Sequence, residues 1–330
     1  FTGNTISEGK AQGVHVLKDG RGTLDTNDIQ RNALAGLEID ENGNPTVSGN
    51  KIHSGFHMGV WVHDNGKGTL DANDIFENKL AGVNIESDSN PVLTNNEVHH
   101  GHDHGVYIHD NGEGVLTEND VHGNSGSGVF IKKGANPQLR RNKIHDGKTT
   151  GVVVDEAGNG TLEDNDIFGN ADAGVEILRD GNPLLRLNNI HHGHSAGVYC
   201  HSDGLGRFEE NEVFSNKAAG VLIKNGGNPE MIKNNIRQGD FTGVHISDSG
   251  RGMFKDNAVY GNEKAGVLVD TLGDPIFINN DIRLGKAEGM CITDKGKGMY
   301  EENNIHENAG AGVAVSKEGN PDMRNNSIYE

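Results

Sequence analysis

Apolar and polar residues alternate in short runs that return every 23 residues along the chain. In residues 59–75, GVWVHDNGKGTLDANDI, apolar residues alternate within each run, and Gly, Asn and Asp separate the runs. A fixed period of about 20–50 residues is typical of a solenoid, a propeller or an array. One asparagine series shows the period without insertion or deletion, and Ile or Val stands two residues after each member: Asn4, Asn27, Asn50, Asn73, Asn96, Asn119, Asn142, Asn165, Asn188, Asn211, Asn234, Asn257, Asn280, Asn303 and Asn326.

Each 23-residue coil contains three runs with the alternation of a β-strand. The first follows a Gly-Val pair, as at Val60 and Val62; the second centres on one apolar residue, as at Leu70; the third is the Asn-x-Ile run, as at Ile75. The residue at the centre of the second run becomes larger from Phe208 onward, so we expect the interior to repack there. The pattern predicts an all-β fold, a right-handed single-stranded parallel β-helix of about 14 coils.

Successive coils differ at their corners, so the full repeat is a double coil of 46 residues. All seven prolines lie at one corner of alternate coils, each after Asn or Asp, where the other coils read Gly-x-Gly. Proline cannot donate to a strand ladder, so this corner is predicted to be a loop. Leucine-rich repeats share the period and are the alternative fold. They need a helical segment of about ten residues with a 3.6-residue period and few glycines, and no such segment occurs.

The asparagine series has a structural explanation that needs no ligand. Amides stacked in register at an inward corner donate to one another and to the backbone, which satisfies buried polar groups. We therefore predict an asparagine ladder and assign no functional role to its members. Loss of one amide, for example at Asn165, is expected to destabilise the fold.

Charge and composition exclude two classes of partner. The net charge is -19, from 29 Lys and Arg against 48 Asp and Glu. Sequence-independent binding of nucleic acid needs clustered cations, and so does docking on anionic membranes. No apolar run is long enough to span a membrane. Neither nucleic-acid binding nor membrane insertion is therefore expected.

The two cysteines give little information on compartment. Cys200 falls on an inward phase and Cys291 on an outward one, about four coils apart, which is about 19 Å at strand spacing and too far for a disulfide. A reducing compartment is compatible with this, and no signal peptide is recognised. The sequence predicts one β-helix domain over residues 1–330, taken from a longer protein.

The alternation of Asn-Lys-Ile-His-x-Gly (50–55, 142–147) with Asn-Asp-Ile-Phe-x-Asn (73–78, 165–170), joined by Gly-Val-x-Ile and Gly-Asn-Pro, carries a resemblance. It resembles the right-handed β-helix repeats of the carbohydrate-binding-and-sugar-hydrolase (CASH) type. Within that type it is most similar to the β-helical F-box-only substrate receptors of cullin-RING ubiquitin ligases. The resemblance covers essentially the whole chain and implies the β-helix fold. Such repeats serve enzymes acting on polysaccharides, surface proteins and interaction domains alike.

Large residues at outward positions of the Gly-Val run suggest a binding surface. Aromatic side chains spaced along a solenoid stack on sugar rings or grip an extended peptide; the alternative is that aromatics simply favour exposed strand positions. Three histidines lie two residues beyond three of the aromatics. The candidate binding residues are Trp61, His63, Tyr107, His109, Phe130, Tyr199 and His201.

Catalytic and metal sites are not predicted. Histidines cluster at residues 99–104 and 191–194 and recur at one corner, which suits either transition-metal ligation or a solvated surface; we assign no metal and no cofactor. Corner carboxylates such as Asp64 and Asp110 recur with the repeat, whereas a catalytic constellation breaks the symmetry. Every coil also has the same length, which leaves no long loop to wall an active-site cleft.

The sequence thus favours a non-enzymatic recognition or scaffolding rod that binds protein. The alternative is a β-helix that binds carbohydrate or acts on polysaccharide as a lyase, epimerase or hydrolase. The repeat is at full strength from Asn4 to Ile328, with no polar cap at either end. Open ends expose apolar residues and unpaired backbone groups. We therefore expect either a rod cut from a longer protein or end-to-end association.

Overall fold

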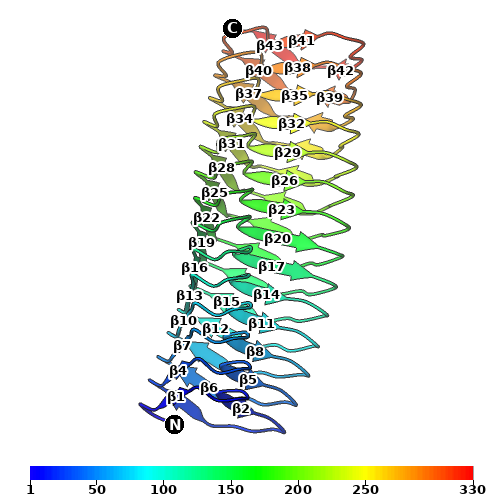
Figure 1. Cartoon of the computed structure of the whole chain (residues 1–330). Coiled ribbons are helices and arrows are strands. Elements are labelled where there is room, and N and C mark those ends of the chain that lie inside the picture. Colours follow the sequence, from blue (N-terminus) through cyan, green and yellow to red (C-terminus); the bar gives the residue numbers. More distant parts are fainter. Residues whose placement is uncertain (330) are drawn as a thin grey trace. The chain divides into compact units, whose positions relative to one another are not determined.

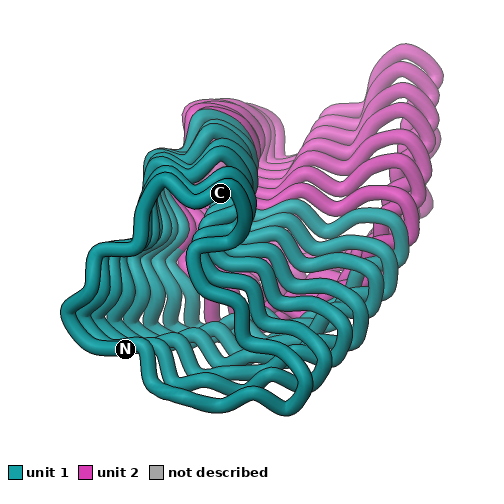
Figure 2. The backbone as a smooth tube through the Cα atoms, turned by 60° about the horizontal axis from the view of Figure 1, so that its bottom comes forward, with its two compact units in different colours: residues 1–166 teal, residues 167–330 magenta. Residues whose placement is uncertain are grey.

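The computed structural model describes residues 1–329, which form two compact units divided between Asp166 and Ile167 (Figure 2). Each unit is a stack of coils, and each coil carries three short strands (Figure 1). The strands fall into three rows, named here the Asn-Ile, Gly-Val and Leu sheets after the runs that form them. The predicted all-β parallel β-helix of about 14 coils is confirmed, and the described residues contain no helix.

Unit 1 contains seven strands in each row. The Asn-Ile sheet comprises β1 (Thr5–Ser7), β4 (Asp28–Gln30), β7 (Lys51–His53), β10 (Asp74–Phe76), β13 (Glu97–His99), β16 (Asp120–His122) and β19 (Lys143–His145). The Gly-Val sheet comprises β2 (Val14–Val16), β5 (Leu37–Ile39), β8 (Val60–Val62), β11 (Val83–Ile85), β14 (Val106–Ile108), β17 (Val129–Lys132) and β20 (Val152–Asp155). The Leu sheet comprises β3 (Thr23–Asp25), β6 (Thr46–Ser48), β9 (Thr69–Asp71), β12 (Val92–Thr94), β15 (Val115–Thr117), β18 (Gln138–Arg140) and β21 (Thr161–Glu163).

Unit 2 repeats the arrangement, and β22 (Asp166–Phe168) lies at the division. Its Asn-Ile strands are β25 (Asn189–His191), β28 (Glu212–Phe214), β31 (Asn235–Arg237), β34 (Ala258–Tyr260), β37 (Asp281–Arg283), β40 (Asn304–His306) and β43 (Ser327–Tyr329). Its Gly-Val strands are β23 (Val175–Ile177), β26 (Val198–Cys200), β29 (Val221–Ile223), β32 (Val244–Ile246), β35 (Val267–Val269), β38 (Met290–Ile292) and β41 (Val313–Val315). Its Leu strands are β24 (Leu184–Arg186), β27 (Arg207–Glu209), β30 (Glu230–Ile232), β33 (Met253–Lys255), β36 (Ile276–Ile278), β39 (Met299–Glu301) and β42 (Asp322–Arg324).

All strand pairs are parallel and offset by one coil, so each residue faces the residue 23 positions away, as Ile75 faces Val98. Asn-Ile and Leu strands point only their middle residue inward, whereas Gly-Val strands point their first and third residues inward. One coil therefore buries four apolar side chains, such as Val60, Val62, Leu70 and Ile75, each 0% exposed. The middle residue of every Gly-Val strand is left on the outer face, which is where the predicted binding residues stand.

The predicted asparagine ladder is confirmed by its hydrogen bonds. Asn73 donates from its backbone nitrogen and from Nδ2 to Oδ1 of Asn96, at 3.0 and 2.9 Å. Asn96 Nδ2 donates in turn to the Leu70 carbonyl oxygen at 2.9 Å. The series members from Asn27 to Asn303 are at most 2% exposed. The amides thus stabilise the inward corner, because they satisfy backbone groups that no water reaches.

The 46-residue repeat has a packing reason at a second corner. Asn78 Oδ1 accepts a hydrogen bond from the Gly55 nitrogen at 3.1 Å, and its Nδ2 donates to the Ile52 carbonyl oxygen at 3.0 Å. A Cβ atom at residue 55 would lie only 3.0 Å from Asn78 Oδ1. Asparagine in one coil therefore favours glycine in the coil before it.

The interior of unit 2 contains the larger column that the sequence predicted. Phe254 and Phe277 stack with ring centroids 4.3 Å apart, and Tyr300 follows at 5.7 Å from Phe277.

Both cysteines are free thiols: Cys200 is buried, Cys291 is partly exposed, and burial raises the pKa of Cys200 to about 12. Val315 and Ile328 are 49% and 50% exposed, whereas the matching interior residues are buried. End-to-end association and the single-domain organisation remain predictions.

Candidate functional site

The outer face of the Gly-Val sheet in unit 1 carries five of the seven predicted binding residues. Trp61 is the middle residue of β8 and Tyr107 that of β14, and both are partly exposed because their strand neighbours occupy the core. Phe130 has the same position in β17. His63 and His109 follow β8 and β14 by one residue. Tyr199 and His201 belong to unit 2, where their rings stack at 4.2 Å.

The aromatic rings pack against their own neighbours more closely than the sequence suggested. Trp61 and His63 stack at 4.0 Å, and Tyr107 lies 4.2 Å from His109. Tyr107 and Phe130 come from adjacent coils and stack at 5.5 Å, whereas Trp61 and Tyr107 lie two coils apart, about 10 Å at strand spacing. Each ring remains partly exposed, which leaves apolar surface for a ligand.

A group of four polar side chains lies beside Trp61 and is named the His15 cluster: His15, Glu38, Asp40 and His63. His15 Nε2 lies 3.0 Å from Asp40 Oδ2 and 3.7 Å from Glu38 Oε1. His63 Nε2 lies 3.2 Å from the same Glu38 oxygen and 3.8 Å from the same Asp40 oxygen. Glu38 is 5% exposed and Asp40 8%. Two buried carboxylates are therefore held between two imidazoles.

The positions 46 residues later form the His109 cluster: Trp61, Asn84, Glu86 and His109. Trp61 Nε1 donates to Glu86 Oε1 at 2.7 Å, and His109 Nε2 lies 3.0 Å from Glu86 Oε2. The hydrogen bond from His109 lowers the pKa of Glu86, although burial opposes this. Burial by itself lowers the pKa of His109, but hydrogen bonds to Glu86 and Asp110 outweigh it and raise that pKa.

Sequence reasoning missed the acidic and amide members of both clusters. It assigned the carboxylates to the corners, where they recur, and the structure adds Glu38, Asp40, Asn84 and Glu86 on the strand face. A signal was present, because residues 23 apart face each other: Glu38 lies opposite both His15 and Trp61 in the sheet register. Single acidic residues recur at these positions, as at Glu86 and Glu176, but both positions are acidic together only at Glu38 and Asp40.

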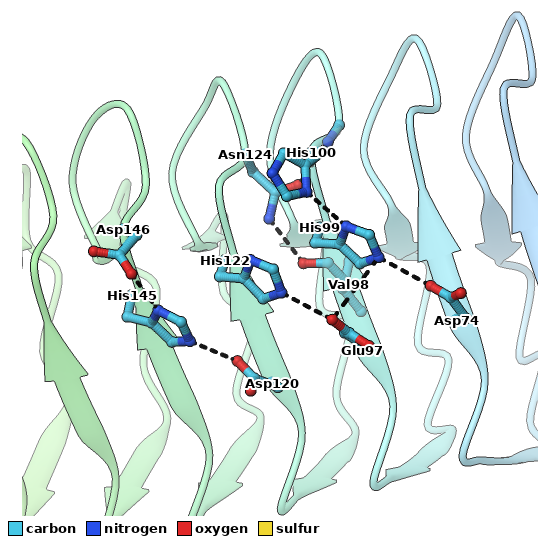
Figure 3. Close-up of polar contacts among 11 residues, drawn as sticks. Asp74, Glu97, Val98, His99, His100, Asp120, His122, Asn124, His145 and Asp146 are labelled. Carbon is cyan, nitrogen blue, oxygen red and sulfur yellow. Dashed lines mark hydrogen bonds and ion pairs between the residues drawn. The ribbon is translucent and has the colours of Figure 1, made fainter.

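The histidines of the Asn-Ile sheet form a second polar surface (Figure 3). His99 and His122 stack at 5.0 Å with planes 4° apart, and His145 continues the column at 5.1 Å from His122. Each Nε2 faces a carboxylate of the preceding coil: Asp74 at 2.9 Å, Glu97 at 3.0 Å and Asp120 at 2.8 Å, respectively. These bonds and stacks account for the histidine spacing without a ligand.

A hollow of about 370 Å³ adjoins this column in unit 1. It is lined by Ser54, Gly55, Phe56, Glu77, Lys79, His100 and His102. Phe56 is 60% exposed there, so the hollow offers one apolar ring among charged groups.

No helix in the described residues is long and apolar enough to cross a membrane.

Comparison with known proteins identifies the fold. The family model described as right handed beta helix region matches residues 1–92, 81–228 and 173–328. A crystal structure of the periplasmic alginate epimerase AlgG is 12% identical, with 95% of this chain and 76% of that chain covered and a TM-score of 0.50. No curated protein matches the chain.

Two further solved structures are more distant. The A-module of Azotobacter vinelandii mannuronan C-5 epimerase AlgE6 is 14% identical, covers 100% and 91% of the two chains and has a TM-score of 0.42. PfbA, a surface adhesin of Streptococcus pneumoniae, is 9% identical, covers 88% and 86% and has a TM-score of 0.26. Of these three structures, AlgG has the TM-score that supports a shared fold.

Proposed function

Because the chain belongs to the right-handed β-helix family, we propose that it recognises an extended, uncharged polysaccharide along the outer face of the Gly-Val sheet in unit 1. The observation that carries the proposal is the row of partly exposed aromatic rings with polar groups between them. Trp61, Tyr107 and Phe130 stand on strands of one face, and the carboxylates and imidazoles of both clusters lie beside them. Rings with polar neighbours suit ligands that have both apolar and hydroxyl-bearing surfaces.

The repeat favours an extended ligand. Trp61 and Tyr107 occupy equivalent positions two coils apart, about 9.6 Å at the spacing of parallel strands. Equivalent contacts at a regular interval suit a polymer with its own regular repeat. The fold likeness to an alginate epimerase is consistent with a polysaccharide ligand and supports the carbohydrate alternative more than the protein-binding reading favoured by the sequence.

The negative charge of this face argues against alginate itself as the ligand of this chain. Alginate is a polyanion, whereas Glu38, Asp40 and Glu86 are acidic groups of the same face and the net charge is -19. Like charges disfavour association, and close carboxylates add desolvation cost. An uncharged glycan avoids this repulsion.

The test is binding of the full chain to neutral and uronate polysaccharides, by affinity electrophoresis and calorimetry. Trp61→Ala and Tyr107→Ala should each weaken binding by at least about fivefold, since an anchoring aromatic commonly contributes over about 1 kcal/mol. Phe76→Ala is the matched control, because Phe76 is an outward ring of the Asn-Ile sheet, stacked on His53 at 4.4 Å. Unchanged binding by both Gly-Val variants would remove the proposal.

The same wild-type and variant proteins distinguish the two remaining hypotheses, a polysaccharide-active enzyme and a protein-binding rod. Release of reducing ends or of unsaturated products would place the chain among polysaccharide-active enzymes. Binding to no glycan, together with loss of an identified protein ligand by Trp61→Ala, would favour the protein-binding rod and its likeness to F-box-only receptors.

A further inference from the structure

We propose that His15, Glu38, Asp40 and His63 bind one divalent transition-metal ion, for which zinc is the natural probe. This inference is independent of the glycan proposal and replaces the sequence-based expectation that no residue binds a metal. It rests on the geometry, burial and charge of the His15 cluster, and on the contrast with its counterpart 46 residues later.

The spacing of the four ligand atoms suits one small ion. The four imidazole-to-carboxylate separations in the cluster are 3.0, 3.2, 3.7 and 3.8 Å. Zinc takes imidazole nitrogen and carboxylate oxygen at about 2.0–2.2 Å in tetrahedral sites, which places ligand atoms about 3.3–3.5 Å apart. The ligand atoms of His15, Glu38 and Asp40 all lie within 4.8 Å of one another. His63 is not part of this group of three, although its Nε2 lies 3.2 and 3.8 Å from the Glu38 and Asp40 oxygens, so a bound ion would draw the two imidazoles together.

Charge in the cluster calls for a cation. Glu38 and Asp40 are 5% and 8% exposed, and no Lys or Arg of the described chain forms an ion pair with either. Asp40 Oδ1 is buried and has no hydrogen-bond partner. Buried charges are stable when they are paired or coordinate a metal. A divalent ion neutralises both carboxylates and gives the open Asp40 oxygen a place in the coordination shell.

The outer shell has the groups that hold metal ligands in place. His63 Nδ1 lies 2.9 Å from Asp64 Oδ2, so the ring presents Nε2 to the cluster while a carboxylate accepts from its other nitrogen. Gln12 Nε2 donates to Glu38 Oε2 at 2.5 Å. Ligating histidines usually donate their second N–H to a carboxylate or carbonyl, which fixes the tautomer.

The ligand types select among metals. Two imidazoles and two carboxylates suit zinc, cobalt or nickel, whereas calcium and magnesium prefer shells made of oxygen. The cluster provides too few oxygens for calcium without many waters, and its burial leaves little room for them. A transition metal is therefore the better fit.

The other two groups of adjacent metal-ligand types in the described residues fit less well. The group of Glu86, His109 and Asp110 has one imidazole, and Asp110 is 46% exposed. In Glu97, His99 and His122 both Nε2 atoms face the same Glu97 oxygen, at 4.0 and 3.0 Å, but the group has a single carboxylate and Glu97 is 53% exposed. Neither group combines two imidazoles with two buried carboxylates, as the His15 cluster does.

The experiment uses the full chain freed of metal by dialysis against EDTA. Calorimetric titration with zinc chloride should show one tight equivalent, and titration with cobalt should give the intense visible absorption of a tetrahedral site. Glu38→Asn and His63→Gln should each weaken zinc binding by about 100-fold or more, since even outer-shell changes cost about 10–100-fold. Asp64→Asn, an outer-shell change, should weaken it by about tenfold.

The control variants test the location. His109→Gln changes the matched residue of the other cluster, and His99→Gln changes the histidine column; both should keep the tight equivalent. Asparagine already occupies the position of Glu38 in the next double coil, at Asn84, so Glu38→Asn is compatible with the fold, and circular dichroism checks each variant. A wild-type chain that takes up no tight equivalent would overturn the proposal. Equal affinity in folded Glu38→Asn or His63→Gln would overturn it as well, and so would loss of the equivalent in His109→Gln.

Discussion

The His15 and His109 clusters occupy the same place in successive double coils but make different contacts. In the first, His15 and His63 contact the same two carboxylates. In the second, the position of His15 is held by Trp61, whose indole donates to Glu86 at 2.7 Å. The position of Glu38 is held by Asn84, which is neutral and 0% exposed. One site keeps two buried negative charges together, while in the other a single carboxylate has two hydrogen-bonding partners, Trp61 and His109.

This difference shows that in a repeat protein the inward residues hold the backbone in place, while the outward residues determine which ligands a site can bind. The inward residues of both double coils are nearly the same, so backbone position and strand register are shared. Only outward residues differ, and these cost the fold little when changed. A functional site is therefore expected where the outward residues depart from the repeat, and the occurrence of two acidic residues together, at Glu38 and Asp40, is such a departure.

The first prediction tries to convert one cluster into the other. The double variant Trp61→His with Asn84→Glu gives the second cluster two imidazoles and two carboxylates, with Asp110 already 2.5 Å from His109 Nδ1 as an outer-shell acceptor. We expect zinc titration to rise from one tight equivalent to two. The matched control, Trp61→Phe with Asn84→Gln, should remain at one. A double variant that stays at one equivalent would show that ligand identity alone does not make the site.

Much of the fold follows from the sequence because its signals are local and repeated. The uninterrupted asparagine series fixes the coil length, and alternation around Val60 and Val62 fixes which side chains enter the core. The positions of Trp61 and Tyr107 on the outer face follow from the same alternation, and the structure agrees with it.

The two clusters were not predicted because their members come from different coils. The 23-residue register places Glu38 opposite His15, but alternation alone says only that both point outward. His63 and Glu38 are 25 residues apart in sequence, two more than one coil, so they are not opposite each other in the register. Whether they touch depends on the direction of each side chain along the strand. Trp61 stacks on His63 at 4.0 Å, and alternation alone does not predict how such packing directs a side chain.

The second prediction concerns the scaffold that both clusters share. Asn96→Ala leaves the backbone and amide donors of Asn73 without their acceptor, and it leaves the Leu70 carbonyl without its donor. Each unsatisfied buried group costs about 1–3 kcal/mol, so the free energy of unfolding should fall by at least that amount. Asn90→Ala is the control, since Asn90 is exposed and its side chain donates to the exposed Glu113 carboxylate, while its backbone bond to Gly66 is kept in the variant. Chemical denaturation measures both, and equal stabilities would contradict the ladder's role.

The third and smallest effect distinguishes the clusters by their response to pH. In the His109 cluster the folded pKa of Glu86 lies below its ordinary value of 4.5, and that of His109 lies above its ordinary value of 6.5. A lowered carboxyl pKa contributes stability above the unfolded value, which is lost as pH falls through the folded value. A raised imidazole pKa contributes stability below the unfolded value, which is lost as pH rises through the folded value.

The stabilisation by this pair should therefore be largest between about pH 4.5 and 6.5 and decline on both sides. We expect the difference in unfolding free energy between the wild type and His109→Gln, measured in EDTA, to vary by about 1 kcal/mol or less over the range pH 4 to 9. EDTA removes metal from the His15 cluster, so the pH-dependent part reports the second cluster alone. A difference that stays constant from pH 4 to 9 would show that the Glu86–His109 contact is a neutral hydrogen bond and not an ion pair.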